Sequence, residues 1–135
     1  AGFGARQLRY VAAVWAASDF VSLHCAATAE TANIMNADAI AAMRPGGYLI
    51  NTARGDVVDE TALAKALHDG VIGGAGLDVF QGEPQINRAL LSAPNTVLLP
   101  HLGSATEETR VAMGMKVVEN ARAFAAGFAL PDKAS

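Results

Sequence analysis

Short apolar runs alternate with helical patterns from Asp19 onward, and this alternation is the strongest restriction on the fold. Four runs are predicted to be strands: DFVSLHC (19–25), YLINTA (48–53), GGAGLDVF (73–80) and TVLLP (96–100). The YLINTA run is typical of a strand that is buried on both faces. Strands that are joined through helices pair in parallel by right-handed crossovers. The sequence therefore predicts an α/β fold that is built on an open parallel sheet.

Capping residues mark where the connecting helices begin and end. Asn36 is a suitable N-cap for a helix over ADAIAAM (37–43), which Pro45 would stop. Asp59 is a suitable N-cap for a second helix, and Gly70 stands where that helix would end. The apolar face of the second helix would consist of Leu63, Ala66 and Leu67. The RGDVV segment before it is predicted to be a loop.

The C-terminal segment carries the pattern of a long helix. Ser104 and Glu107 have the spacing of a capping box, which predicts a helix that starts at Ser104. The helix would continue for roughly 20 residues to Gly127. Its apolar stripe would consist of Val111, Met115, Val118, Ala121 and Ala125.

Composition and charge argue against several classes of partner. The formal net charge is -3 and Lys and Arg are scattered singly, so nucleic acid is not an expected partner. The one cysteine, Cys25, cannot form an intrachain disulfide, and no apolar run approaches the roughly 18 residues of a membrane span. No spacing of histidines and carboxylates suggests a metal site. These features indicate a soluble protein of a reducing compartment, the cytoplasm, without a membrane partner.

Three glycine-containing motifs are similar to known signatures, but none of them is interpreted as functional. GFGARQ (2–7) lacks a third glycine and a preceding strand, and the glycines of GGAGLD (73–78) precede their strand, so neither is a dinucleotide fingerprint. The second set is better explained as small residues in a tight loop. RGD (54–56) matches an adhesion tripeptide, but it follows a buried-strand pattern in a chain without a secretion signal. Adhesion is therefore not expected.

Polar residues follow each predicted strand, at the sheet edge where ligands bind in open α/β folds. An arginine can bind a carboxylate through two parallel hydrogen bonds, a histidine can exchange a proton near neutral pH, and a carboxylate can orient that histidine. One residue of each of these types follows a separate predicted strand: Arg54, Glu83 and His101. Together they predict acid–base chemistry on an anionic substrate.

Each of these three residues also has a purely structural interpretation. Arg54 could cap a helix, Glu83 could be a solvated loop residue, and His101 could be a structural residue in a turn. Their joint placement at strand ends favours the chemical interpretation. Of the other histidines, His24 is expected in the wall of the site, and His68 in the last turn of a helix, where its charge suits the helix dipole.

Three ordered motifs resemble one enzyme family. NTARGDVVDETAL, GAGLDVFQGEP and LLPHLGSAT resemble the signature segments of the D-isomer-specific 2-hydroxyacid dehydrogenases. The continuation GSATEETRVAMG is similar to the glyoxylate and hydroxypyruvate reductase branch. The resemblance implies a Rossmann-like fold and an NAD(P)-dependent oxidoreductase.

The resemblance implies catalytic roles for three residues. Arg54 would bind the carboxylate of a 2-oxoacid and polarise its carbonyl group. His101 would protonate the carbonyl oxygen as hydride arrives, and Glu83 would pair with that histidine. Pro100 and Gly103 are expected to fix a turn that aims His101 into the cleft.

The resemblance also implies a site for NAD or NADP and a small 2-oxoacid or D-2-hydroxyacid as substrate, with glyoxylate or hydroxypyruvate favoured. Asp78 would form a hydrogen bond near the nicotinamide, and the chain at Gly103 and Ser104 would pass close to its carboxamide. The full-length protein is expected to be a homodimer. Other residues implied to contact the cofactor are Cys25, Thr52, Ala53, Arg54 and His101.

Two features of full-length family members are not found in the sequence. These are a substrate domain and a G-x-G-x-x-G turn with the acidic residue that discriminates NAD from NADP. The chain is therefore expected to be a fragment. Residues 1–127 would be an N-terminally truncated Rossmann-like domain with a long C-terminal helix, and residues 128–135 a loose tail.

Two functional hypotheses follow from the sequence. The first is part of an NAD(P)H-dependent D-2-hydroxyacid dehydrogenase. The alternative is a non-catalytic, dehydrogenase-derived module for nucleotide sensing or oligomerisation, which the missing fingerprint favours. The set of Arg54, Glu83 and His101 favours the enzyme, because a sensor would have no chemical need for it.

Overall fold

A computed structural model describes residues 4–133 of the chain. Gly2 of the GFGARQ motif and the end of the predicted tail lie outside these residues. The chain divides into two compact units, Ala1–Pro100 and His101–Ser135.

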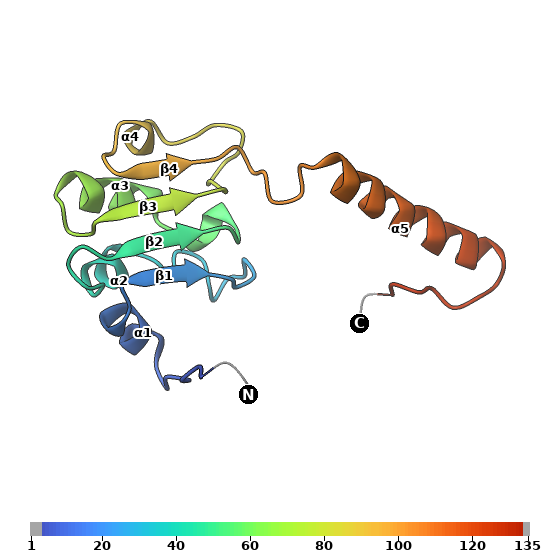
Figure 1. Cartoon of the computed structure of the whole chain (residues 1–135), viewed down its shortest axis with the longest axis horizontal. Helices are drawn as coiled ribbons and strands as arrows, with labels where there is room; N and C mark the ends of the chain where they lie inside the picture. Colours follow the sequence, from blue (N-terminus) through green and yellow to red (C-terminus); the bar gives the residue numbers. More distant parts are fainter. Residues whose placement is uncertain (1–3, 134–135) are drawn as a thin grey trace. The chain divides into compact units, whose positions relative to one another are not determined.

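A parallel sheet of four strands forms the centre of the first unit (Figure 1). The spatial order β1-β2-β3-β4 is also the order along the chain, and every neighbouring pair is parallel. Phe20 is in register with Tyr48, and Tyr48 with Gly74. The predicted α/β fold with a parallel sheet is confirmed. The strands are β1 Phe20–Leu23, β2 Tyr48–Asn51, β3 Gly74–Leu77 and β4 Thr96–Leu98.

Two of the connecting helices begin where the sequence predicts. The Asn36 side chain accepts a hydrogen bond from the Ala39 N–H at 2.9 Å, and the Asp59 side chain accepts one from the Ala62 N–H at 2.9 Å. Both caps are confirmed. The short helix α4 and the single 3-10 turn η1 were not predicted. The helical elements of this unit are α1 Val11–Ala17, α2 Ala37–Ala41, η1 Gly55–Val57, α3 Glu60–His68 and α4 Arg88–Leu91.

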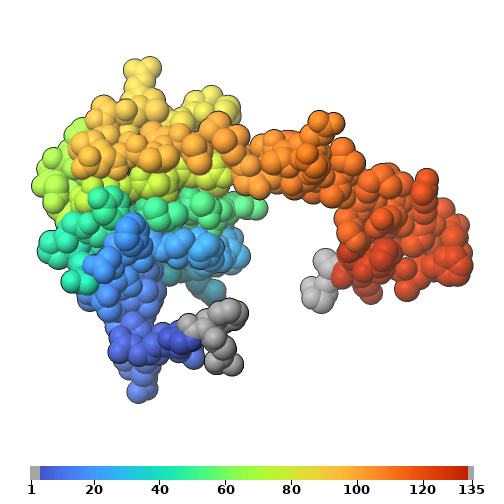
Figure 2. Space-filling view, in the orientation of Figure 1, coloured from blue at the N-terminus to red at the C-terminus, as the bar shows by residue number. Residues whose placement is uncertain are grey.

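The core of the first unit lies between α2, α3 and one face of the sheet. Leu49 of β2 and Leu63 of α3 are completely buried there. The prediction that β2 is buried on both faces is wrong, because the opposite face of the sheet is exposed. Tyr48 of β2 is 41% exposed there. Its ring stacks on the ring of Phe20 of β1, which is 68% exposed. Figure 2 shows the residues of the strands at the surface on this side. Within residues 4–100 the helices cover one face only.

The second unit contains one long helix, α5 Glu107–Ala125. The predicted start at Ser104 is wrong, because the N-cap is Thr106, whose hydroxyl accepts the Thr109 N–H at 3.2 Å. The predicted end is confirmed by Gly127, whose φ of 72° terminates the helix. No residue of α5 is buried. No helix among residues 4–133 is long and apolar enough to cross a membrane.

A direct contact between two stretches of backbone joins the ends of β2 and β3. Gly55 lies against the carbonyl group of Phe80 and the amide nitrogen of Gln81. A Cβ atom at position 55 would overlap these atoms, so only glycine allows the two loops to approach this closely. The RGDVV segment is therefore held against the chain that follows β3.

Glu60, the first residue of α3, is a carboxylate in a buried position, with 4% of its surface exposed. Its Oε1 accepts a hydrogen bond from the Gln81 N–H at 2.6 Å. Burial raises the pKa of the Glu60 carboxyl, the hydrogen bond from Gln81 opposes the rise, and the nearby Asp56 and Glu83 carboxylates add to it.

Replacing Gly55 by alanine should destabilise the protein strongly. The added methyl group cannot be placed without separating two backbone segments, so we expect a loss of about 3 kcal/mol in the free energy of unfolding. Gly114→Ala is the matched control, because no atom lies within 4 Å of the added Cβ on α5. That variant should gain up to about 1 kcal/mol. Equal stabilities of the two variants in urea unfolding would contradict the contact at Gly55.

Replacing Glu60 by glutamine should remove a pH dependence of stability. Between the ordinary glutamate pKa of 4.5 and the raised value, the folded protein binds a proton at Glu60 that the unfolded chain releases. The wild type therefore loses stability as the pH rises through this window. The difference in free energy of unfolding, Glu60→Gln minus wild type, should therefore increase as the pH rises through this window. Above the window the difference should stay constant. A difference that does not change with pH would contradict the raised pKa.

Candidate active site at the carboxyl edge of the sheet

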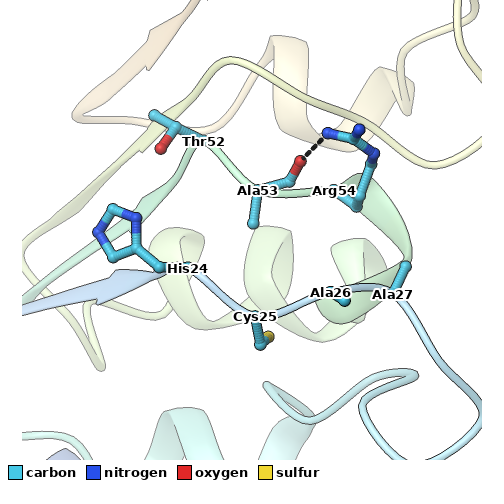
Figure 3. Close-up of a pocket in the computed structure, with 7 residues that line it drawn as sticks. All are labelled: His24, Cys25, Ala26, Ala27, Thr52, Ala53 and Arg54. Atoms are coloured by element: carbon cyan, nitrogen blue, oxygen red, sulfur yellow. Dashed lines mark hydrogen bonds between the residues drawn. The ribbon is translucent and has the colours of Figure 1, made fainter. Parts of the chain in front are cut away.

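A cavity of about 440 Å³ opens at the carboxyl ends of β1 and β2 (Figure 3). Two chain segments form it, one directly after each strand. The structure thus brings together four residues that the sequence predicted for a cofactor site, and it adds His24, which was expected in the wall. The residues that line the cavity are His24, Cys25, Ala26, Ala27, Thr52, Ala53 and Arg54.

Asn51, the last residue of β2, fixes the loop that carries Arg54. Its side chain is almost completely buried, with 1% exposed. The Asn51 Nδ2 donates to the Arg54 carbonyl oxygen at 2.9 Å, and its Oδ1 accepts from the Ala53 N–H at 3.0 Å. Asn51 belongs to the YLINTA run that the sequence predicts to be a strand, but the sequence predicts no role for it in the site. A polar residue that ends a buried apolar strand is the signal that could have identified it, because buried amides need hydrogen-bond partners.

The Arg54 guanidinium is available for an anion. Its Nη1 donates to the Ala53 carbonyl oxygen at 2.6 Å (Figure 3), and the side chain is exposed. Among residues 4–133 no carboxylate forms an ion pair with it. A guanidinium has five N–H donors, so most of them remain for a carboxylate ligand. This is an electropositive group at the rim of a cavity.

The turn after β3 carries Asp78 and Glu83. Asp78 is buried, and its backbone N–H donates to the Asn51 carbonyl oxygen at 3.0 Å, which continues the pairing of β2 with β3. The Glu83 Oε1 accepts the Phe80 N–H at 2.8 Å. Both residues therefore lie on a turn that is attached to the loop of Arg54 through the Gly55 contact.

The second unit begins with the remaining candidates, His101, Gly103 and Ser104. The predicted turn differs in its details. His101 itself has a φ of 55°, in the left-handed region, whereas Gly103 does not. A hydrogen bond of 2.9 Å from the Ala105 N–H to the Leu102 carbonyl oxygen closes the turn. A histidine in this conformation is uncommon and indicates a constrained position.

Two further side chains, those of His24 and Cys25, line the cavity. The His24 Nε2 lies 2.8 Å from the Ser22 hydroxyl, and Cys25 is a half-buried free thiol. Within the described residues, no group of three or more histidines, cysteines and carboxylates could hold a metal ion.

Comparison with known proteins relates this arrangement to one family. The family model described as D-isomer specific 2-hydroxyacid dehydrogenase, NAD binding domain, matches residues 3–103. The chain is 51% identical to glyoxylate reductase of Thermococcus litoralis over 110 residues, which are 82% of this chain and 33% of that protein. It is 49% identical to glyoxylate/hydroxypyruvate reductase B of Serratia proteamaculans over 106 residues, 78% of this chain and 33% of that protein. The chain spans about a third of the length of the curated relatives it matches.

Solved structures give the same relationship. The crystal structure of an NADPH-dependent glyoxylate/hydroxypyruvate reductase from Sinorhizobium meliloti, in complex with NADP and malonate, matches with a TM-score of 0.86 and 46% identity. The match covers 91% of this chain and 39% of that one. A D-isomer specific 2-hydroxyacid dehydrogenase from Polaromonas, described as putative, matches with a TM-score of 0.92 and 34% identity, over 98% of this chain and 41% of that one. The resemblance of the sequence motifs is confirmed, and the chain belongs to the D-isomer-specific 2-hydroxyacid dehydrogenases, as part of their NAD-binding domain.

Proposed function

We propose that the full-length protein is an NAD(P)H-dependent reductase of small 2-oxoacids, with glyoxylate or hydroxypyruvate as substrate. The observation that carries the proposal is the exposed Arg54 guanidinium at the rim of a cavity at the carboxyl edge of a parallel sheet. This is the edge where ligands bind in open α/β folds. The names of the relatives support the same class of substrate.

The residues around the cavity fit a nicotinamide cofactor in part. A volume of about 440 Å³ is within the usual range of small-molecule sites. The wall side chains of Cys25, Thr52 and Ala53 are small and uncharged, which leaves room for a flat ring. The Thr52 hydroxyl can form a hydrogen bond. We assign Asp78, Gly103 and Ser104 to the same cofactor on the basis of the family motifs. When bound, NAD(P)H supplies the hydride.

Arg54 binds and orients the substrate in this proposal. Its planar guanidinium donates two parallel hydrogen bonds to the 2-oxoacid carboxylate. The remaining donors can polarise the neighbouring carbonyl oxygen, where negative charge develops during reduction. Because Asn51 fixes the backbone of Arg54 on both sides, the guanidinium approaches the substrate from a defined position.

His101 supplies the proton in this proposal. In the reduction, for which bound NAD(P)H would supply the hydride, the protonated imidazole would give its proton to the carbonyl oxygen of the 2-oxoacid and become neutral, so that the product would be a 2-hydroxyacid. Glu83 stabilises the imidazolium before the transfer. The neutral imidazole then regains a proton from solvent, and in the oxidation direction it accepts the proton of the hydroxyl group.

The proposal is tested with the purified full-length protein. Oxidation of NADH and of NADPH is followed by absorbance with glyoxylate and with hydroxypyruvate, and we expect turnover with at least one pair. Binding of either nucleotide without turnover of any 2-oxoacid would overturn the proposal and favour the non-catalytic nucleotide-sensing module.

His101→Asn is the sharpest variant for the same assay. Asparagine tolerates the left-handed backbone of residue 101 but cannot transfer a proton at neutral pH. We expect kcat to fall by roughly 10²–10⁴. His68→Asn, at an exposed position in the last turn of α3, is the control and should keep the wild-type kcat. An unchanged kcat in His101→Asn would exclude His101 as the acid.

Arg54→Lys tests the binding of the substrate carboxylate. Lysine keeps the charge but loses the planar pair of donors, so KM for the 2-oxoacid should rise by about tenfold or more, with a smaller effect on KM for the nucleotide. Arg88→Lys, at an exposed position of α4, is the control. If Arg54→Lys keeps both kcat and KM for the 2-oxoacid, Arg54 does not bind the substrate.

A further inference from the structure

Glu60 is a buried carboxylate that the proposed mechanism does not use. A carboxylate in such a position is unfavourable unless it is hydrogen bonded, and its partner is the backbone N–H of Gln81, at 2.6 Å. Helix capping does not explain it, because Asp59 already caps α3. A glutamate in a capping box stands at the third helical position, whereas Glu60 stands at the first. The contact with Gln81, 21 residues away in the sequence, is the interaction that remains to be explained.

Gln81 connects the turn after β3 to the segment after β2. Its backbone is held by Glu60, and its side-chain Nε2 donates to the Asn33 Oδ1 at 3.0 Å and to the Val58 carbonyl oxygen at 2.9 Å. Three acceptor groups, one from the segment after β1 and two from the segment after β2, therefore meet at this one residue of the turn after β3. A residue that is bound through both its backbone and its side chain has little freedom to move.

Phe80, the neighbour of Gln81, contacts the segments that carry two of the three candidate catalytic residues, Arg54 and Glu83. The Phe80 N–H donates to the Glu83 carboxylate, and the carbonyl group of Phe80 lies against Gly55, next to Arg54. A shift of the Phe80–Gln81 backbone would therefore move the Glu83 carboxylate and the Arg54 loop at the same time. Glu60 is the side chain that holds this backbone from the helix side.

We propose that Glu60 is a positioning residue for substrate binding, which sets the Arg54 loop and the Glu83 turn in one arrangement by holding the Gln81 amide. The assignment rests on the proposed function, because it gives Arg54 and Glu83 their roles. Glu60 acts through Gln81 and touches no substrate. It therefore differs from a catalytic residue, and its removal should change KM for the 2-oxoacid more than KM for the nucleotide.

The test uses the full-length enzyme with the variants Glu60→Met and Glu60→Gln. Methionine has a similar length without a strong acceptor, and the glutamine amide oxygen can still accept the Gln81 N–H. We expect KM for the 2-oxoacid to rise about fivefold or more in Glu60→Met, which corresponds to the loss of one hydrogen bond. In Glu60→Gln the same KM should stay within about twofold of the wild-type value. Amide hydrogen exchange at Gln81 should accelerate in Glu60→Met alone.

Asp59→Ala is the matched control on the same helix. It removes the cap of α3 and lowers stability, but it leaves Glu60 and Gln81 in place. A purely structural role of Glu60 would make Asp59→Ala and Glu60→Met behave alike. We expect KM for the 2-oxoacid to rise in Glu60→Met only.

A double-mutant cycle separates action through Arg54 from an independent effect. If Glu60 works by placing Arg54, Glu60→Met in an Arg54→Lys background should add less than about a twofold change in KM. Additive effects would overturn the proposal, as would a wild-type KM in Glu60→Met or a raised KM in Asp59→Ala. If the wild-type enzyme reduces no 2-oxoacid, the proposed function and the role of Glu60 are both overturned. If the wild type is active and Glu60→Met has the wild-type KM, only the role of Glu60 is overturned.

Discussion

The backbone of Gly55 rests directly on the backbone of Phe80 and Gln81, and the arrangement of the sheet edge depends on this contact. It joins the loop after β2 to the turn after β3, although the two are far apart in the sequence. Any side chain at position 55 would separate them. The pairing of β2 with β3 brings these segments to the same edge, and the absence of a Cβ atom allows them to touch.

At this edge the buried polar side chains hold the backbone of the loops. The exposed side chains are therefore not needed for that purpose and are available for ligands. Asn51 holds the backbone around Arg54, and Glu60 holds the backbone of Gln81. The Arg54 guanidinium has only the neighbouring Ala53 carbonyl oxygen as a partner among residues 4–133, so it can face an anion. A rigid loop with a free terminal group is what orientation of a small substrate requires.

The sequence was sufficient for features that depend on neighbouring residues and insufficient for those that depend on distant ones. The parallel sheet and the caps at Asn36 and Asp59 follow from local patterns, and all are confirmed. The predicted start of α5 was wrong because Ser104 and Thr106 are both acceptable caps, and it is the Thr106 hydroxyl that accepts the Thr109 N–H. Burial of β2 on both faces was wrong because it depends on what covers the sheet. The contact of Glu60 with Gln81 could not be predicted, since no periodicity relates them. The domain boundary at residue 127, the homodimer and the cytoplasmic location stay predictions.

The side of the sheet that carries Phe20, Tyr48 and Val97 is rich in exposed apolar surface. Gly74 of β3 lies in register with Tyr48, and its lack of a side chain leaves room for the Tyr48 ring on this side of the sheet. Large exposed apolar surfaces associate with one another in water. We expect residues 4–100 by themselves to associate increasingly as their concentration rises, because contact between two such faces would remove apolar side chains from water.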